Sequence, residues 1–228
     1  MGKRELSKEY GDQNIYYDKY YSEVIGNNSR GLAKWFSSYP HRLIEAPFKN
    51  NLGMKILEVG SGENEHIQFV KSDFCEYISL DKNPPKNTNL LPNAYFKLGN
   101  AESLSFNDCY FDRFIMTCVL LHLNDPEQAL LEARRVTKIG GRLSFYVPPE
   151  PSLLLSIFRE LFPKRRAKAL GFEGYDLFIA RDHINYFKGI REILLEVFKK
   201  DVVKIIYRPF PLRTWYLNAV VVFQITKT

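Results

Sequence analysis

The residues of this sequence best suited to chemistry stand in a short turn, EVGSGENE, that follows an apolar run. Gly60 and Gly62 flank Ser61, and glycines let a backbone turn sharply and approach a ligand closely. Three carboxylates surround this turn, and they belong to Glu58, Glu63 and Glu65. Any ligand that binds this turn must therefore be compatible with the negative charge of the surrounding carboxylates.

A dinucleotide is the ligand that such a turn commonly receives, through the fingerprint G-x-G-x-x-G and an acid about 20 residues later. Gly60 and Gly62 match the first two glycines, and Asp81 ends the next apolar run, where an acid that binds ribose belongs. The third glycine position holds Glu65. Because carboxylates repel a pyrophosphate group, the sequence disfavours a dinucleotide.

A ligand with ribose and adenine but with a positive charge instead of pyrophosphate fits these residues better. S-adenosylmethionine carries a sulfonium and an ammonium and has no phosphate. The carboxylate of Glu58 would complement its positive end, and Asp81 would accept hydrogen bonds from the ribose hydroxyls.

The elements that must position this turn follow from the hydrophobic pattern. Short apolar runs alternate with helical patterns from residue 53 onward, which predicts a parallel sheet with helices on both faces. The expected strands of this part are 54–60, 76–81, 94–100, 112–121 and 142–147, and the expected helices are 64–73 and 125–140. Two β-branched runs, 201–208 and 218–226, predict an antiparallel pair at the end of the sheet. We therefore expect an α/β fold, a Rossmann-like doubly wound sheet that is mostly parallel and binds ligands beyond the carboxyl ends of its strands.

The helix at 125–140 carries the clearest local signals. Asp125 can cap it, Pro126 suits its first turn, Gln128 would complete a capping box, and Gly140 would end it. Its expected inward stripe is Ala129, Leu130, Ala133 and Val136.

Two further parts complete the expected organisation. Residues 1–50 read as a helical, aromatic-rich cap, and residues 51–228 read as the main domain. Within that domain, residues 149–187 form a helical insert after the fifth strand, which we expect to cover the substrate. In the insert, a helix ends at Pro163 and a basic turn follows up to Gly171.

Four segments in this order resemble class I S-adenosylmethionine-dependent methyltransferases, close to the group that includes the ubiquinone/menaquinone methyltransferases. They are ILEVGSGENEH, YISLD, GNAESL and FDRFIMTCVLLHLNDPEQALLEARRVTKIGGRLSF, within about residues 53–147. The resemblance implies an enzyme that uses S-adenosylmethionine as its cofactor. It also implies a set of cofactor-binding residues: Glu58, Gly60, Ser61, Gly62, Asp81, Asn100, Ala101, Thr117 and Cys118.

The resemblance assigns these residues to parts of the cofactor. The glycine turn and Glu58 would lie beside the methionine end, and Asp81 would hold the ribose hydroxyls. Asn100 and Ala101 would meet the adenine. Backbone carbonyls of Thr117 and Cys118 would approach the amino group of the cofactor. The side chain of Cys118 is better interpreted as a small buried apolar group than as a nucleophile.

The sequence departs from the family pattern at three positions. Asn64 stands where a third glycine is usual, and asparagine tolerates a left-handed backbone better than most residues do. Asn100 replaces the usual acid of the adenine segment, and Ile139 replaces a proline. None of these changes removes the cofactor site.

Two histidines are the candidates for a general base, His122 after the fourth strand and His183 in the segment ARDHINYF. A histidine accepts a proton near neutral pH, although each is about as well explained as a hydrogen-bonded structural residue. We expect both to line the substrate pocket. No metal is predicted, because Cys75, Cys109 and Cys118 lack the spacing of metal ligands.

The sequence leaves the methyl acceptor open. Loose similarity to methyltransferases of bacterial surface-glycan pathways, in the insert and around His183, favours a small-molecule acceptor such as an oxygen of a sugar or glycan intermediate. The alternatives are a lipid or quinone precursor as acceptor, or a protein that binds S-adenosylmethionine without catalysis.

Charge and hydropathy limit the partners and the location. The net charge of +6 is modest and no nucleic-acid motif accompanies it, so no nucleic-acid partner is expected. No signal sequence or membrane span is evident, which predicts a cytoplasmic location. The apolar run 152–162 beside the basic run 163–168 would suit a transient contact with a membrane surface, although packing against the domain explains it equally well.

Overall fold

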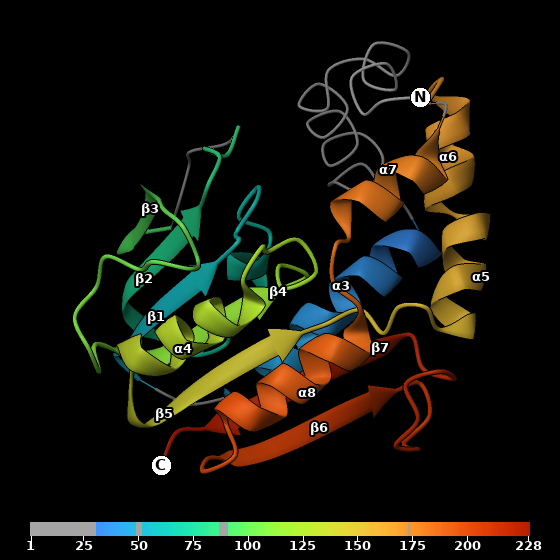
Figure 1. Cartoon of the computed structure of the whole chain (residues 1–228). Helices are drawn as coiled ribbons and strands as arrows, with labels where there is room; N and C mark the ends of the chain where they lie inside the picture. The colour runs from blue at the N-terminus through green and yellow to red at the C-terminus, as the bar shows by residue number, and fades with distance from the viewer. Residues whose placement is uncertain (1–30, 49–51, 87–90, 173) are drawn as a thin grey trace.

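The computed structural model describes residues 31–48, 52–86, 91–172 and 174–228 (Figure 1). Most of the expected N-terminal cap, residues 1–30, lies outside the described residues. The rest of the cap contains α3 (Leu32–Glu45) and the short 3₁₀ turn η2 (Ala46–Phe48).

A seven-stranded sheet in the order β3-β2-β1-β4-β5-β7-β6 forms the centre of the molecule. Its strands are β1 (Met54–Val59), β2 (Phe74–Asp81), β3 (Ala94–Leu98), β4 (Phe111–Thr117), β5 (Thr137–Tyr146), β6 (Val202–Arg208) and β7 (Val220–Thr226). Strands β1 to β5 pair in parallel, and β7 is antiparallel to both β5 and β6. The predicted α/β fold, with its antiparallel C-terminal pair, is therefore confirmed.

Helices cover both faces of this sheet, which explains why its central strands are continuous apolar runs. In Figure 1, α4 (Pro126–Val136) and α8 (Phe187–Val197) lie on the near face and α3 lies on the far face. The buried core divides accordingly into one cluster under α4 and α8 and a smaller cluster under α3.

The predicted signals of α4 are confirmed at its start and along its buried face. Asp125 Oδ1 accepts a hydrogen bond from Gln128 N at 2.9 Å, and Pro126 occupies the first turn. The stripe of Ala129, Leu130, Ala133 and Val136 is buried. The predicted end at Gly140 is wrong, because Thr137 already pairs with Phe111 as the first residue of β5.

The predicted helix over residues 64–73 is also wrong. Only a 3₁₀ turn, η3 (His66–Phe69), forms there. Asn64 has a left-handed φ of 59° and leaves the helical region just before the turn. Glu45 of α3 then binds both the ring of His66 and the backbone N of Lys71. These two bonds hold the segment in a conformation other than an α-helix.

Three helices form the insert after β5: α5 (Leu153–Leu161), α6 (Pro163–Ala169) and α7 (Tyr175–Asp182). The basic turn predicted before Gly171 is instead α6, since Pro163 suits a first helical position and lysine, arginine and alanine favour helix. In Figure 1 the insert stands beyond the carboxyl ends of β4 and β5. Within the described part of the chain, no helix combines the length and the apolar character needed to cross a membrane.

A buried ionic cluster joins α3 to the sheet. The side chains of Glu45, His66 and Arg113 are fully buried. Arg113 of β4 places its two terminal nitrogens 2.6 and 3.1 Å from the carboxylate oxygens of Glu45. His66 Nε2 lies 3.0 Å from Glu45 Oε1, and His66 Nδ1 lies 2.8 Å from His41 Nδ1. The cluster thus links α3, η3 and the central strand β4.

This cluster predicts that acid destabilises the protein. Burial and the neighbouring charge of His66 lower the pKa of His41 from 6.5 to about 3. The unfolded chain therefore binds a proton at His41 below its ordinary pKa while the folded chain does not, so stability falls as pH drops from 6.5 towards about 3. We expect the free energy of unfolding to fall by about 1–2 kcal/mol between roughly pH 7.5 and pH 5, as measured by urea denaturation.

The matched variant is His41→Phe, which keeps the ring that stacks on Phe69 and removes the titrating nitrogen. Its unfolding free energy should depend less on pH over the same interval. An unchanged pH slope in His41→Phe would contradict this assignment.

Candidate active site

The glycine turn lies at the carboxyl end of β1 and packs against the chain that follows β4. Gly60 and Gly62 have left-handed φ angles of 73° and 51°. A Cβ added to Gly60 would lie 2.0 Å from Val119 Cγ2, so this close approach requires glycine. Gly60 N donates to Leu80 O of β2 at 2.7 Å. The turn is therefore fixed between the ends of β2 and β4.

Asp81 ends β2 and supports the turn with its carboxylate. Its Oδ2 accepts a hydrogen bond from Gly62 N at 2.9 Å, and its Oδ1 accepts one from Asn83 N at 3.0 Å. Each carboxylate oxygen has a second acceptor position. Asp81 therefore keeps acceptor capacity for hydroxyl groups while it shapes the turn.

Glu58 lies below the turn in the interior. It is 2% exposed, and Tyr77 Oη donates to its Oε2 at 2.6 Å. Burial raises the pKa of Glu58 above its ordinary value. Its predicted place beside the positive end of the cofactor stays a prediction.

Two buried side chains of the turn carry polar atoms without partners. Ser61 Oγ and both side-chain polar atoms of Asn64 have no hydrogen-bond partner among the described residues. Buried polar groups are nearly always hydrogen-bonded in folded proteins, so such orphans need a ligand or water. Together with the glycine turn and Asp81, they fit a polar cofactor such as S-adenosylmethionine.

The other predicted cofactor residues lie along the same edge of the sheet. Thr117 ends β4, and Cys118 follows it with a left-handed φ of 60°. Burial raises the pKa of the Cys118 thiol to about 12, so the thiol stays protonated at neutral pH. After β3, Asn100 Oδ1 accepts from Glu102 N at 3.0 Å in a local turn, and Ala101 between them is buried.

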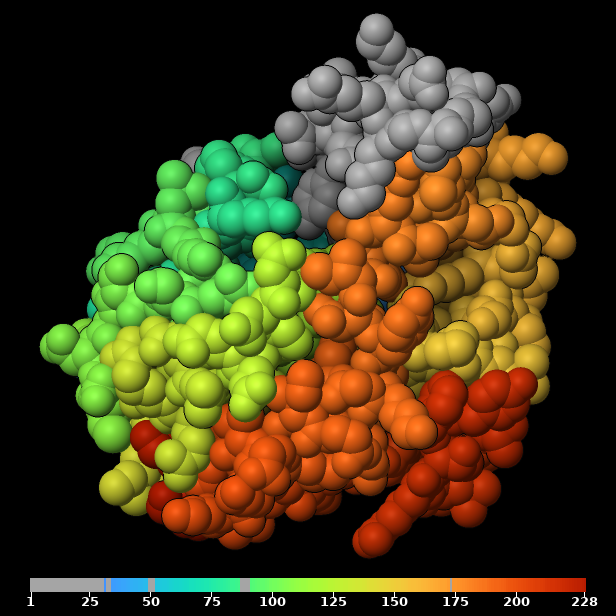
Figure 2. Space-filling model, in the orientation of Figure 1, coloured from blue at the N-terminus to red at the C-terminus, as the bar shows by residue number. Residues whose placement is uncertain are grey.

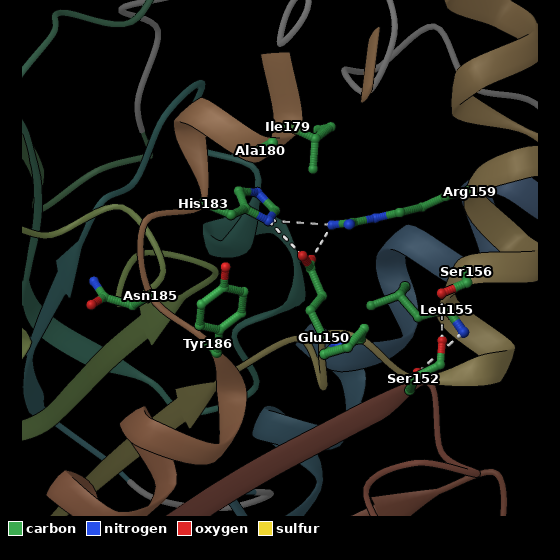
Figure 3. A pocket seen from close by; sticks show the side chains of 11 residues that line it. Glu150, Ser152, Leu155, Ser156, Arg159, Ile179, Ala180, His183, Asn185 and Tyr186 are labelled. Atoms are coloured by element: carbon green, nitrogen blue, oxygen red, sulfur yellow. Dashed lines mark hydrogen bonds and ion pairs between the residues drawn. The ribbon is translucent and has the colours of Figure 1, made fainter. Parts of the chain in front are cut away.

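A cavity of about 190 Å³ lies beside this edge, between the end of β5 and the insert (Figure 3). It is lined by Glu150, Pro151, Ser152, Leu155, Ser156, Arg159, Ile179, Ala180, His183, Asn185 and Tyr186. Asn185, one of these lining residues, donates hydrogen bonds to backbone oxygens of Leu120 and Leu123. The cavity and the glycine turn are thus both next to the chain that follows β4.

His183 is the histidine that lines this cavity. Its Nδ1 lies 2.8 Å from Glu150 Oε2 and 3.4 Å from an Arg159 nitrogen, and Arg159 also pairs with Glu150. Figure 3 shows these three side chains pointing toward one another. Burial alone would raise the pKa of Glu150, but the hydrogen bond with His183 and the charge of Arg159 hold it below its ordinary value. Glu150 is therefore an anion beside the imidazole.

His122 is not among the residues that line the cavity, but it contacts His183. The two rings meet edge to face with their centroids 4.8 Å apart. His122 Nδ1 lies 3.0 Å from the backbone O of Asp182 and 3.3 Å from its Oδ2. Donor atoms of these three residues lie within 4.8 Å of one another, as metal ligands could. The adjacent guanidinium of Arg159 disfavours a second cation, and proton transfer is the chemistry that this arrangement suits better.

Three residues of the cavity were missed by the sequence reasoning: Glu150, Arg159 and Asn185. Asn185 Nδ2 donates to Leu120 O at 3.1 Å and to Leu123 O at 2.7 Å, which fastens the insert to the chain after β4. A signal existed for Glu150 and Asn185, since one is an acid just past the fifth strand and the other is two residues from His183. No sequence signal pointed to Arg159, because a single arginine in an apolar helical pattern is typical of an ordinary surface residue.

Comparison with known proteins agrees with this geometry. Residues 57–145 match a family described as a methyltransferase domain. A 2-methyl-6-phytyl-1,4-hydroquinone methyltransferase of Spinacia oleracea is 24% identical over 202 residues, which cover 78% of this chain and 56% of the relative. The ubiquinone/menaquinone biosynthesis C-methyltransferase UbiE of Francisella tularensis subsp. novicida is 31% identical over 97 residues, which cover 42% and 38%. The chain spans about half the length of the plant relatives that it matches.

Solved structures share the fold. A chain solved with the Trm112 methyltransferase activator of Haloferax volcanii has a TM-score of 0.59 at 14% identity, over 99% of this chain and 97% of the other. A S-adenosylmethionine-dependent methyltransferase of Thermotoga maritima has a TM-score of 0.55 at 17% identity, over 98% and 99%. The matched methyltransferase domain, the strand order and the turn at the end of β1 thus agree with the expected resemblance to class I S-adenosylmethionine-dependent methyltransferases.

Proposed function

We propose that this chain methylates a small-molecule acceptor bound in the cavity beside His183. The observation that carries the proposal is that the glycine turn packs against Val119, while Asn185 of the His183 cavity bonds to Leu120 and Leu123 in the same chain after β4. S-adenosylmethionine, when bound, supplies an electrophilic methyl group on its sulfonium. The contribution of the protein is to align the acceptor with that group and to exclude water.

The turn residues would hold the cofactor. Asp81 would accept hydrogen bonds from the ribose hydroxyls while it keeps its bond to Gly62 N. Ser61 Oγ and the amide of Asn64, which are buried and lack partners among the described residues, would gain partners on the ligand. Asn100 and Ala101 would border the adenine, and the carbonyls of Thr117 and Cys118 would lie near the amino group, as the family pattern implies.

His183 would act as the general base. If its Nδ1 donates to the Glu150 carboxylate, its Nε2 is the unprotonated nitrogen and can take a proton from the acceptor. The anionic Glu150 then stabilises the imidazolium that forms, as a carboxylate does in other histidine-based sites. His122, in contact with the His183 ring, would help to fix its orientation.

The cavity favours a flat acceptor that carries a hydroxyl group. Its lining combines the apolar side chains of Leu155 and Ile179 and the ring of Tyr186 with the polar groups around His183. Deprotonation of an aromatic hydroxyl by His183 would activate either the oxygen or the ring carbon beside it. The hydroquinone and quinone-pathway names of the relatives favour the same acceptor class. We therefore place a quinol-type acceptor first, and the sugar or glycan oxygen predicted from the sequence remains a second class for the same assay.

An acceptor screen tests the function directly. Purified protein with S-adenosylmethionine should form S-adenosylhomocysteine faster when a hydroquinone is added, and a parallel series with sugars tests the glycan prediction. A protein that binds S-adenosylmethionine but turns over with no acceptor would support the non-catalytic alternative.

The first variant tests the cofactor site. Asp81→Asn removes the carboxylate charge and one acceptor oxygen, so we expect S-adenosylmethionine to bind about tenfold more weakly in calorimetric titration. Asp73→Asn is the matched control, because Asp73 is an exposed aspartate that immediately precedes the first residue of β2, far from the turn. Equal affinity of Asp81→Asn and the wild type would reject this placement of the ribose.

The second set tests the base. His183→Gln and Glu150→Gln should lower kcat by about a hundredfold, since general base catalysis typically contributes at least that much, and should leave cofactor affinity unchanged. Glu160→Gln is the control, because Glu160 is an exposed carboxylate on α5 that pairs with Lys164. A parallel loss of turnover and cofactor affinity would instead mean that His183 and Glu150 only maintain the structure.

A further inference from the structure

A stripe of exposed apolar side chains runs along the outer face of α5. Leu153, Ile157 and Leu161 are spaced four residues apart, so they share one face of the helix. They are 44%, 46% and 44% exposed. Isolated exposed leucines are common, but three in a row on one helix face are a feature that needs an explanation.

The stripe continues into the loop between β6 and β7. Leu153 N donates to Tyr216 O at 2.9 Å, which brings this loop against the start of α5. In Figure 2 the loop (red, lower right) adjoins the lower part of the gold surface, which is α5. We use the term apolar band for the exposed residues of both segments: Leu153, Ile157, Leu161, Phe210, Leu212, Tyr216 and Leu217.

Positive charge accompanies the apolar band. The segment 202–228 contains no acidic residue; Arg208 ends β6 and Arg213 lies in the loop that follows. The helix after α5, α6, adds the basic side chains of Arg165, Arg166 and Lys168. Lys164 is already paired with Glu160 and Asp176. The surface around the band is therefore cationic on both sides.

The inner face of α5 lines the cavity. Leu155, Ser156 and Arg159 line the space beside His183 (Figure 3). On the same helix, Leu153, Ile157 and Leu161 of the apolar band are exposed to solvent. The helix thus separates the cavity from the apolar band by its own thickness. An acceptor with a long apolar tail could keep its tail outside this helix and place its head group in the cavity.

We propose that the apolar band is a docking surface for an anionic phospholipid bilayer, from which a lipid-tailed acceptor reaches the cavity. The second half of this inference rests on the proposed function, whereas bilayer binding itself does not. Apolar side chains beside arginines and lysines are the composition that binds at the boundary between head groups and acyl chains. A second copy of the chain is the poorer occupant, because a symmetric contact would bring the same cations together.

Vesicle sedimentation tests this proposal with the full chain. We expect binding to phosphatidylcholine vesicles that contain about one third phosphatidylglycerol, weaker binding to pure phosphatidylcholine, and a loss of that preference at high salt. No binding to the anionic vesicles, or equal binding to both kinds at low salt, would overturn the proposal.

Variants locate the surface. Ile157→Asp combined with Leu212→Asp should weaken vesicle binding at least tenfold, and Arg213→Glu should weaken binding to anionic vesicles by about fivefold or more. Ile139→Asp is the matched control, since Ile139 is 75% exposed and lies in β5 outside the band. Circular dichroism melts of all variants exclude misfolding as the cause. An equal loss in Ile139→Asp would reject the band as the binding surface.

Two further readouts separate the alternatives. Sedimentation velocity without vesicles should show the same mass for wild type and Ile157→Asp, and dissociation of a dimer in the variant would assign the band to self-association instead. Turnover of a short-chain hydroquinone should be equal in wild type and the double variant, whereas turnover of a long-tailed hydroquinone in vesicles should fall only in the variant. Failure of both turnover assays with intact vesicle binding would reject the function and keep the docking surface.

Discussion

The buried ion pair between Glu45 and Arg113 is the interaction on which the arrangement around the sheet depends. Arg113 lies in the central strand β4 and is fully buried. The carbon of its guanidinium group lies 3.5 Å from the centre of the Phe48 ring. A charge in that position is tolerated only with a partner, since removal of one member of a buried pair typically costs about 3–5 kcal/mol. Glu45 also binds His66 and Lys71 N, and so it fixes the segment that leaves the glycine turn.

Much of the fold follows from local patterns, but the exceptions have a common physical origin. The strands and the capped helix α4 were predictable because apolar periodicity and capping residues act within a few positions of the chain. The segment 64–73 has a helical pattern, yet its conformation is decided by Glu45, which is distant in the sequence. The same limit applies to the site. The positions of the glycine turn and of Asp81 at strand ends were predictable from the apolar pattern. The grouping of Glu150, Arg159 and His183 instead depends on how three separate segments pack.

The chain after β4 contacts both parts of the proposed site, the glycine turn and the cavity beside His183. On one side, Val119 packs so closely against Gly60 that no side chain would fit at that position of the turn. On the other side Cys118 adopts a left-handed backbone that most residues avoid. Such local strain persists only where the surroundings impose it, and here the Cys118 N bond to Tyr146 O at 3.0 Å and the packing of Cys118 against the buried cluster under α3 do so. A small side chain at this position is thus explained by geometry and not by thiol chemistry.

The bonds of Asn185 and the contacts of α5 determine how the walls of the cavity are held. Its backbone N and its side-chain amide bind Leu121 O, Leu120 O and Leu123 O, so the junction of α7 and α8 moves only together with the chain after β4. Helix α5 is held at its start by the bond from Leu153 N to Tyr216 O, and further along by the stacking of Phe158 on Phe36 of α3 and the pairing of Arg159 with Glu150. Both walls of the cavity are thus anchored to the main domain, the α7–α8 side through Asn185 and the α5 side through Phe158 and Arg159, so an acceptor would enter a preformed space.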